Sequence, residues 1–216
     1  MFLPLSAMEE KLTSLLENVK SIFMRYGIKS VTMDDLCREM GISKKTLYQF
    51  VSDKNDLVKK AMSHEICTDQ LEMNSVLEKN LGAIDELMEI TKLVGVKLKN
   101  MHPSILYDMQ KYYPEAWEIM SKHRNGYIVQ TIKNNILKGQ KEGIYRFDLN
   151  EQIIALLFAS KIELFADTNA YAHLGLTPSQ MYAENLIYHI RGIANLEGIK
   201  LLEQKFSSSN PSPYEK

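Results

Sequence analysis

The chain has 216 residues, of which 45% are hydrophobic and 25% are charged, and its formal net charge is -1. This is the composition of an ordinary globular protein with enough apolar residues for a real core, and it excludes a strongly basic nucleic-acid protein. The charge is unevenly placed, because residues 1–62 hold 10 basic and 8 acidic residues and the remainder holds 16 and 19. The N-terminal part can therefore carry a small basic surface.

Cysteine usage and apolar runs bear on the cellular compartment. The two cysteines, Cys37 and Cys67, cannot form a disulfide framework for a chain of this size, so we expect a cytoplasmic protein. The strongest apolar run, residues 153–159, is far shorter than the roughly 18 residues that span a bilayer. Residues 1–5 are apolar but lack a basic lead and contain Pro4, unlike a signal peptide. We expect no membrane partner.

The first predicted helix covers residues 8–26, where apolar residues recur at helical spacing, and it ends at Gly27. A second helix starts at Thr32, whose hydroxyl forms a capping-box pattern with the carboxylates that follow. Its apolar residues form one stripe, at positions i, i+3, i+4 and i+7, that the first helix can cover: Met33, Leu36, Cys37 and Met40. Gly41 tolerates the left-handed conformation that ends a helix.

A further helix is predicted over residues 44–51 with Ser43 as its cap, so two helices meet across a turn of about three residues. Its apolar residues would face the core, and the opposite face is centred on Lys45 and Gln49. That outer face carries no acidic residue, which suits a surface that approaches phosphates. The alternative interpretation is a small helical hairpin with a solvated outer face.

Residues 41–57, GISKKTLYQFVSDKNDL, resemble the helix-turn-helix signature of the tetracycline-repressor (TetR) family of bacterial regulators. The resemblance is specific over residues 10–60. Lys45 stands where many members have a small residue or proline, and Phe50 takes a position often held by a polar ring. The DNA sequence that is read and one backbone contact would then differ from those of relatives.

Eight residues of this region are our candidates for contacts with DNA. Four would reach base edges: Lys44, Lys45, Thr46 and Gln49. Four would contact phosphates: Thr32, Ser43, Tyr48 and Lys54. Lys54 lies in the first turn of the next helix, where a cation is unfavourable unless a phosphate is near, and the resemblance implies that it contacts the DNA backbone.

The remaining sequence predicts an all-α fold. A helix capped by Ser52 or Asp53 would run to about residue 72 without a flexible linker, and further helices follow over 77–100, after Pro103, and over 114–139, 150–169 and 178–205. We expect three parts: a helix-turn-helix DNA-binding domain over residues 1–53, a helical effector-binding and dimerisation domain over 54–206, and a disordered tail over 207–216.

Residues 84–128 are rich in soft and aromatic side chains, which suit either an apolar pocket or a core. In the TetR family this region encloses the inducer, so the resemblance implies a small, fairly apolar effector. The candidate effector-binding residues are Met88, Met109, Tyr113, Trp117, Met120, Arg124 and Tyr127. Arg124 and Asn135 lie on an apolar stripe, where polar groups need water, a neighbour or a ligand as a partner.

The last two long helices favour a homodimer. Residues 153–159 are apolar on every side of their helix, and the final helix carries two adjacent apolar stripes, so pairing with a second copy would bury this surface. The family dimerises through its last two major helices. The alternative is an ordinary monomer core. A dimer would present two recognition helices to half-sites about 34 Å apart, or a multiple of it, on palindromic DNA.

Catalytic motifs are absent from the sequence, and its five histidines are scattered. We therefore expect no enzyme activity, no metal site and no cofactor. The expected function is a sequence-specific transcriptional regulator, a repressor that a small effector releases from a palindromic double-stranded DNA operator. One alternative is a helical small-molecule-binding or interaction protein without DNA binding. Another is an enzyme with a histidine site that no motif reveals.

Overall fold

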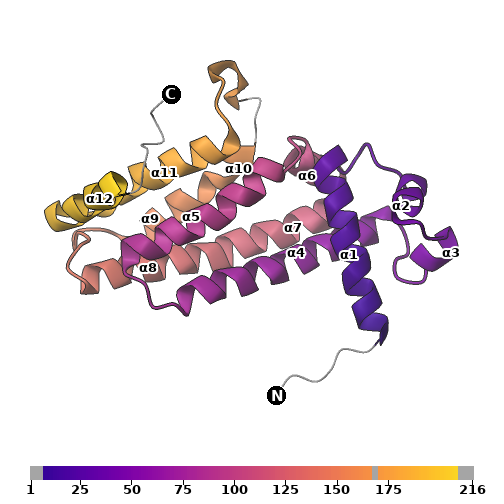
Figure 1. Ribbon diagram of the computed structural model, residues 1–216, viewed down its shortest axis with the longest axis horizontal. Helices are drawn as coiled ribbons and strands as arrows, with labels where there is room; N and C mark the ends of the chain where they lie inside the picture. Colours follow the sequence, from indigo (N-terminus) through magenta and orange to yellow (C-terminus); the bar gives the residue numbers. More distant parts are fainter. Residues whose placement is uncertain (1–6, 167–169, 209–216) are drawn as a thin grey trace. The chain divides into compact units, whose positions relative to one another are not determined.

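The structure is a computed structural model that describes residues 7–166 and 170–208. Within these residues the fold is all-α, as predicted, with one isolated antiparallel bridge between Tyr145 and Ala194 (Figure 1). The helices are α1 (Ala7–Tyr26), α2 (Met33–Met40), α3 (Lys44–Leu47), α4 (Lys54–Leu77), α5 (Ala83–Asn100), α6 (Ile105–Tyr112), α7 (Pro114–His123), a π-helical turn (Arg124–Ile128), α8 (Val129–Lys141), α9 (Glu151–Ser160), α10 (Ile162–Ala166), a 3-10 turn (Ala172–Leu174), α11 (Pro178–Ile193) and α12 (Leu196–Ser208).

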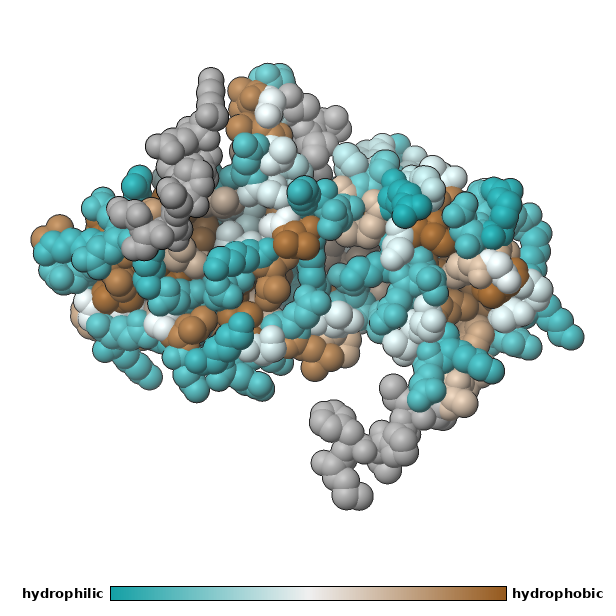
Figure 2. All heavy atoms as spheres, in the orientation of Figure 1, coloured by the Kyte–Doolittle hydropathy of each residue, from teal (hydrophilic) through white to brown (hydrophobic). Residues whose placement is uncertain are grey.

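The chain divides into two compact units. Unit 1 comprises Met1–Leu71 and Asn100–His123, and unit 2 comprises Glu72–Lys99 and Arg124–Lys216. Unit 1 thus contains α6 and α7 in addition to the N-terminal helices. The domain boundary that we expect after residue 53 stays a prediction, as does the tail, most of which lies outside the described residues. In Figure 2 the visible surface is mainly hydrophilic, with apolar side chains gathered in small separate areas.

One apolar core holds unit 1 together. The side chains of Val19 from α1, Leu36 from α2, Leu47 from α3 and Leu57 from α4 are completely buried in it. Met33 and Met40 pack against the same cluster, which confirms that α1 covers the apolar stripe of α2. Helices α6 and α7 add a further buried group, consisting of Ile105, Met109, Tyr113 and Ala116.

Most helix ends follow local rules that the sequence reveals. Gly27 and Gly41 adopt positive φ angles of 81° and 65° at the ends of α1 and α2, where a side chain would be strained. Thr177 forms a capping box at the start of α11, with Gln180 as its partner. Asn150 caps α9 through its side-chain oxygen, which accepts the Ile153 amide at 3.0 Å.

Several predicted helices have other boundaries or are interrupted in the structure, and the predicted helix over 150–169 is divided into α9 and α10. Helix α4 extends to Leu77, and α5 begins only at Ala83 because the chain turns at Asn80 with a φ of 51°. The predicted helix over 114–139 contains a π-helical turn at Arg124–Ile128. The predicted final helix is interrupted at Ala194, where the backbone becomes extended and Asn195 caps α12 by accepting the Glu197 and Gly198 amides.

Unit 2 contains a second apolar core with a polar network inside it. The Asn135 amide donates to the Ala83 carbonyl oxygen at 2.9 Å and to the Glu86 carboxylate at 2.7 Å, and Lys138 donates to the same carboxylate. Tyr145 is completely buried beside Gly139, where an added Cβ would lie 2.1 Å from the Tyr145 ring. The buried amide of Asn135 therefore finds its hydrogen-bond partners in the Glu86 side chain and the Ala83 backbone.

His189 is a buried histidine of α11 in unit 2. Its ring centroid lies 4.6 Å from that of Phe158, and its Nε2 atom has no hydrogen-bond partner among the described residues. Burial lowers the pKa of the imidazole to about 4, and the nearby charge of Lys161 acts in the same direction. The folded chain therefore holds this ring in its neutral form at neutral pH.

We predict that His189 makes folding sensitive to mild acid. Its folded-state pKa lies below its unfolded-state pKa of about 6.5, so the unfolded chain takes up the proton first. The stabilisation is complete above pH 6.5 and is lost as the pH falls towards 4, by up to about 3 kcal/mol. Urea unfolding of wild type and His189→Gln across this range should show a shallower loss for the variant. His173→Gln, at an exposed position, is the control and should follow the wild type.

Candidate nucleic-acid interface

Helix α2 and the turn after it are fixed by hydrogen bonds close in sequence. The Thr32 hydroxyl accepts the Asp35 amide at 3.1 Å, and the Thr32 amide donates to the Asp35 carboxylate at 3.0 Å. The Thr32 hydroxyl also donates to the Asp35 carboxylate at 2.6 Å, and this bond together with the one from the Thr32 amide holds the pKa of the Asp35 carboxyl below its usual range. At the other end, the Ile42 amide donates to the Cys37 carbonyl oxygen at 3.0 Å beyond Gly41. The capping box and the glycine stop that the sequence predicts are confirmed.

Helix α3 is shorter than predicted. Ser43 caps it by accepting the Thr46 amide at 3.0 Å, as expected. The regular helix ends at Leu47, and residues 48–50 continue in turns in which Tyr48 and Phe50 donate amide hydrogen bonds to Lys44 and Leu47. The predicted helix over 44–51 is therefore a single regular helical turn followed by further turns. The residues predicted to face the core and those predicted to face solvent nevertheless do so.

The outer face of α3 is polar and exposed. Lys44, Lys45, Tyr48 and Gln49 are exposed, whereas Leu47 is completely buried. Lys44 forms an ion pair of 2.7 Å with Asp34 of α2, and this contact raises the pKa of the lysine. Within the described chain Lys45 forms no ion pair. A phosphate or a base edge could therefore contact the ammonium of Lys45 directly. The ammonium of Lys44 is held only by the solvent-exposed carboxylate of Asp34.

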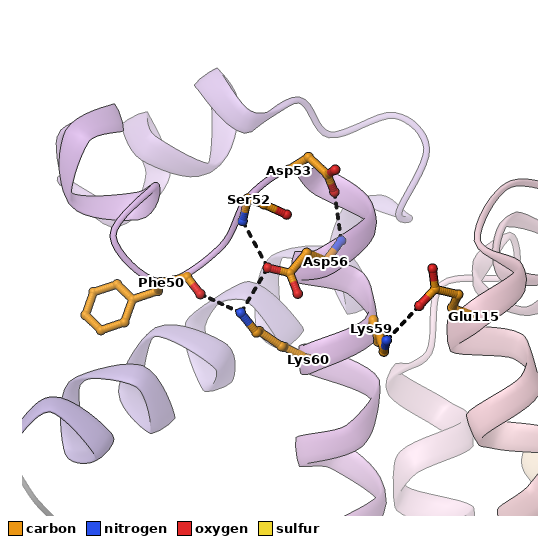
Figure 3. A network of polar contacts seen from close by, with 7 residues as sticks. All are labelled: Phe50, Ser52, Asp53, Asp56, Lys59, Lys60 and Glu115. Atoms are coloured by element: carbon orange, nitrogen blue, oxygen red, sulfur yellow. Dashed lines mark hydrogen bonds and ion pairs between the residues drawn. The ribbon is translucent and has the colours of Figure 1, made fainter.

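A polar network joins the end of this segment to the start of α4 (Figure 3). The Asp56 carboxylate accepts the Ser52 amide and the Lys60 ammonium, both at 2.9 Å, and Lys60 also donates to the Phe50 carbonyl oxygen at 2.7 Å. Asp53 accepts the Asp56 amide at 2.9 Å, so of the two predicted caps it is the one that caps α4. The Lys60 ammonium holds the pKa of the Asp56 carboxyl below its usual range.

The turn between α1 and α2 is held from two sides by charged residues. Lys54 donates from its ammonium to the carbonyl oxygens of Ile28, at 2.7 Å, and of Val31. Asp108 of α6 accepts the amides of Ile28 and Lys29 at 3.1 and 2.9 Å. The backbone of this turn therefore finds its donors and acceptors in side chains from α4 and α6, and Thr32 is positioned at the end of it.

Lys54 consequently differs from the other seven candidate DNA contacts. Its side chain is half-buried, and burial lowers the pKa of its ammonium, with the charge of Lys29 acting in the same direction. Its partners are backbone carbonyl oxygens of its own chain. No observation tests the phosphate contact expected of Lys54; its partners within the chain lead us to propose a positioning role instead, and the salt dependence of DNA binding distinguishes the two roles.

Asp108 is a positioning residue that is not among the candidates predicted from the sequence. The signal available was a carboxylate on the apolar face of α6, where it is 95% buried beside Ile105 and Met109. Buried carboxylates require hydrogen-bond donors, so the position itself predicted a partner. The identity of that partner, a turn about 80 residues earlier, could not be derived from the sequence.

The candidate effector-binding residues do not gather in one compact unit. Four of them belong to the apolar core of unit 1, either as buried members or packed against it: Met109, Tyr113, Trp117 and Met120. The other three lie in unit 2, where Arg124 pairs with Glu163, Tyr127 donates to Asn74 at 2.7 Å and Met88 lines a cleft. Burial raises the pKa of the Tyr113 phenol. Their joint role around an effector stays a prediction.

The predicted dimerisation helices expose apolar side chains unequally. In α9 and α10 the side chains of Ile153, Leu156, Leu157 and Leu164 are about half exposed, and in α11 Tyr188 is 70% exposed. Most residues of the two α11 stripes are instead buried inside unit 2, namely Tyr182, Leu186, Ile187, Ile190, Ile193 and Ala194. These six residues therefore belong to the core of one chain. The exposed apolar surface of the predicted dimerisation helices lies mainly on α9.

Residues 7–166 and 170–208 contain neither a cluster of metal ligands nor a membrane-spanning helix. No group of three or more His, Cys, Asp or Glu side chains in this part of the chain is placed to hold a metal ion. No helix in it is long and apolar enough to cross a membrane.

Comparison with known proteins supports the interpretation of the α2–α3 segment. Residues 15–61 match the sequence model of the bacterial regulatory proteins of the tetR family. Over 91 residues the chain is 33% identical to the uncharacterized HTH-type transcriptional regulator YvaF of Bacillus subtilis (strain 168). That alignment covers 41% of this chain and 47% of the relative, so the chain spans about half the length of the curated protein that it matches.

Solved structures share the fold over most of the chain. A transcriptional regulator from Cytophaga hutchinsonii has a TM-score of 0.67 at 17% identity, covering 86% of this chain and 99% of its own. A TetR-family regulator from Agrobacterium tumefaciens has a TM-score of 0.69 at 16% identity, covering 87% and 99%. The reduced form of NemR from Escherichia coli has a TM-score of 0.69 at 12% identity, covering 86% and 97%. At these identities the likeness concerns the fold alone.

The capped α2–turn–α3 segment with its exposed basic face defines a protein of the helix-turn-helix class. The match over residues 15–61 specifies it further: this segment is similar to the bacterial regulatory proteins of the tetR family, and the fold of the chain is similar to that of solved regulators. This is a family of transcriptional regulators and not of enzymes. The resemblance to this family over the N-terminal segment and the all-α fold class, both predicted from the sequence, are thereby confirmed.

We predict that Lys54→Met lowers stability more than it changes the salt dependence of DNA binding. The variant leaves the carbonyl oxygens of Ile28 and Val31 without their donor, which should cost about 1–3 kcal/mol of unfolding free energy. Thermal or urea unfolding measures this loss. Because the ammonium is engaged within the chain, the slope of log K against log salt should stay within error of the wild type.

A slope reduced by about one unit, with unchanged stability, would instead identify Lys54 as a direct phosphate contact. Lys122→Met, at an exposed position of α7 in the same unit, is the matched control for the loss of one lysine. It should change neither quantity.

Proposed function

We propose that the chain is a repressor that binds a palindromic operator as a homodimer and is released by a small effector. The observation that supports this proposal most directly is the exposed polar face of α3 in a capped helix pair, whose preceding turn is held by bonds from α4 and α6. A DNA-binding regulator works where the chromosome lies, so we place the protein in the cytoplasm.

In this proposal α3 enters the major groove and the flanking residues contact phosphates. Lys44, Lys45, Thr46 and Gln49 reach base edges, where lysine pairs with guanine and glutamine with adenine. Phosphates are contacted by three hydroxyl-bearing residues, Thr32, Ser43 and Tyr48. Thr32 and Ser43 lie at the N-termini of α2 and α3, where the backbone amides favour an anion. Lys44 exchanges its solvent-exposed partner Asp34 for DNA at little cost, since exposed ion pairs contribute about 0–1 kcal/mol.

The homodimer of this proposal forms through the last two long helical segments. The exposed apolar side chains of α9 and α10 supply most of the surface, and Tyr188 adds an aromatic ring from α11. A two-fold axis there would hold two copies of α3 for half-sites about 34 Å apart, or a multiple of it. The dimer therefore determines which operator spacing the protein recognises.

The effector of this proposal acts by favouring a dimer whose two α3 helices no longer match the half-sites. Helix α4 begins next to the α3 segment and runs without interruption to Leu77, which provides a continuous element for such coupling. A coupling free energy of about 1–3 kcal/mol would change operator affinity roughly 5- to 150-fold. The effector is a small molecule with a substantial apolar part.

We predict that Lys45→Ala weakens operator binding by about 1–3 kcal/mol and relaxes specificity at one base pair. Lys45 is the exposed lysine of α3 that forms no ion pair within the described chain. Fluorescence anisotropy with DNA flanking the protein's own gene measures the affinity, and single base-pair changes in that DNA reveal the position that is read.

Lys122→Ala is the control, because this lysine is exposed and ion-paired on α7 of the same unit. If the variant loses equal affinity for operator DNA and for unrelated DNA, Lys45 contacts the DNA backbone and does not recognise a base. No binding of wild type to any flanking DNA would favour a helical ligand-binding or interaction protein.

We predict that Leu157→Glu converts the protein into a monomer in solution. The side chain is 55% exposed on α9, so the change costs the monomer little and places a charge in the proposed interface. Analytical ultracentrifugation should give one chain mass for the variant and two for the wild type. Val96→Glu, an exposed apolar position of α5 in the same unit, should remain dimeric. A wild-type monomer at micromolar concentration would contradict the proposed interface.

A further inference from the structure

Unit 2 contains a cleft of about 630 Å³ between α5 and α12. The segment that joins α4 to α5 borders it through Lys79 and Leu81, so three separate stretches of the chain line the cleft. Its volume falls within the range of about 300–1,000 Å³ that small-molecule sites occupy. The cleft therefore has room for a ligand of ordinary metabolite size.

The two helices each contribute an apolar side chain to this cleft. Met88 comes from α5 and Leu201 from α12, and both are partly buried, with part of their surface packed on the core of unit 2. Methionine is unbranched and polarisable, so it adjusts to ligands of different shape. Together with Leu81 these residues offer apolar surface to a hydrocarbon chain or an aromatic ring.

Charged side chains of both signs line the cleft, and the positive ones are in excess. Asp85 pairs with Lys205 at 2.5 Å and Glu89 pairs with Lys92 at 2.5 Å. Lys79 lies 4.0 Å from the other oxygen of Glu89, at the outer limit of an ion pair. Of these three ammonium groups, that of Lys79 lies farthest from its carboxylate partner, so its charge is the least neutralised by these pairs.

From this geometry we propose that the cleft binds an amphipathic anion, a small molecule that joins a carboxylate or similar acidic group to a hydrocarbon or aromatic part. The acidic group binds the exposed ammonium of Lys79, with Lys92 nearby on the far side of the Glu89 carboxylate, and the apolar part packs on Met88 and Leu201. Because Met88 is one of the candidate effector residues, this inference rests on the proposed function and names the chemical class of its effector.

The exposure of the ammonium groups determines how such a ligand binds. Lys79 and Lys92 are more than half exposed, so the anion keeps part of its hydration and the attraction is weakened by salt. The apolar contact supplies the remaining free energy, in proportion to the surface removed from water. Both parts of the ligand are then required, and a neutral or cationic analogue of equal length binds more weakly.

Titration calorimetry with decanoate as the probe tests this proposal. Decan-1-ol and decyltrimethylammonium carry the same chain with a neutral and a positive head group. We expect decanoate to bind at least tenfold more tightly than either analogue at low salt, and its affinity to fall as salt is raised. Equal affinities for decanoate and decanol would overturn the proposal, because the lysines would then contribute nothing.

A double variant locates the binding. Lys79→Gln with Lys92→Gln removes two charges from exposed positions and should weaken decanoate binding at least tenfold. Lys200→Gln is the matched control: it lies on α12, pairs with Glu197 outside the cleft and should change the affinity less than twofold. Met88→Asp tests the apolar contact and should also weaken binding. Unchanged affinity in both cleft variants would place decanoate elsewhere and overturn the proposal.

Operator titrations separate this inference from the proposed function. If the ligand-free protein binds operator DNA and decanoate does not bind, only the cleft proposal fails. If decanoate binds in the cleft but the protein binds no flanking DNA, the proposed function fails. Decanoate bound in the cleft without any change in operator affinity would contradict its assignment as the effector class.

Discussion

The helix-turn-helix depends on how the turn before α2 is held. Lys54 from α4 binds the carbonyl oxygens of Ile28 and Val31, and Asp108 from α6 binds the amides of Ile28 and Lys29. These bonds satisfy a backbone segment that belongs to no regular element, and they fix the start of α2 at Thr32. Because each is a charge-assisted bond in a partly buried place, the loss of either residue leaves several backbone groups unpaired.

Local features of the helix-turn-helix could be read directly from the sequence. Thr32, Gly41 and Ser43 act through groups within a few residues, so their caps and stop follow from residue type and spacing alone. The inward side of α3 is equally predictable, since Leu47 is buried at the position that helical periodicity assigns to it. The family match over residues 15–61 falls on this same well-determined part.

Features that depend on distant parts of the chain could not be read in this way. The position of Asp108 predicts that it needs a partner but not which turn provides it, and at the break in the last helix Ala194 pairs with Tyr145, about 50 residues earlier in the chain. Aromatic and methionine residues suit a core and a pocket equally well, so the sequence did not reveal that Met109 and Tyr113 would join the core of unit 1. Six apolar residues of the stripes predicted for the dimer are likewise buried in unit 2, because an apolar stripe suits a monomer core as well as an interface.

The central claim is that two copies of α3 read DNA at a fixed spacing set by a dimer. Hydroxyl-radical footprinting of the wild-type protein on DNA flanking its own gene measures this directly. We expect two protected half-sites related by two-fold symmetry, with centres about 34 Å apart or a multiple of that distance. Protection of a single half-site, or of no defined segment at concentrations where the protein is dimeric, would contradict it.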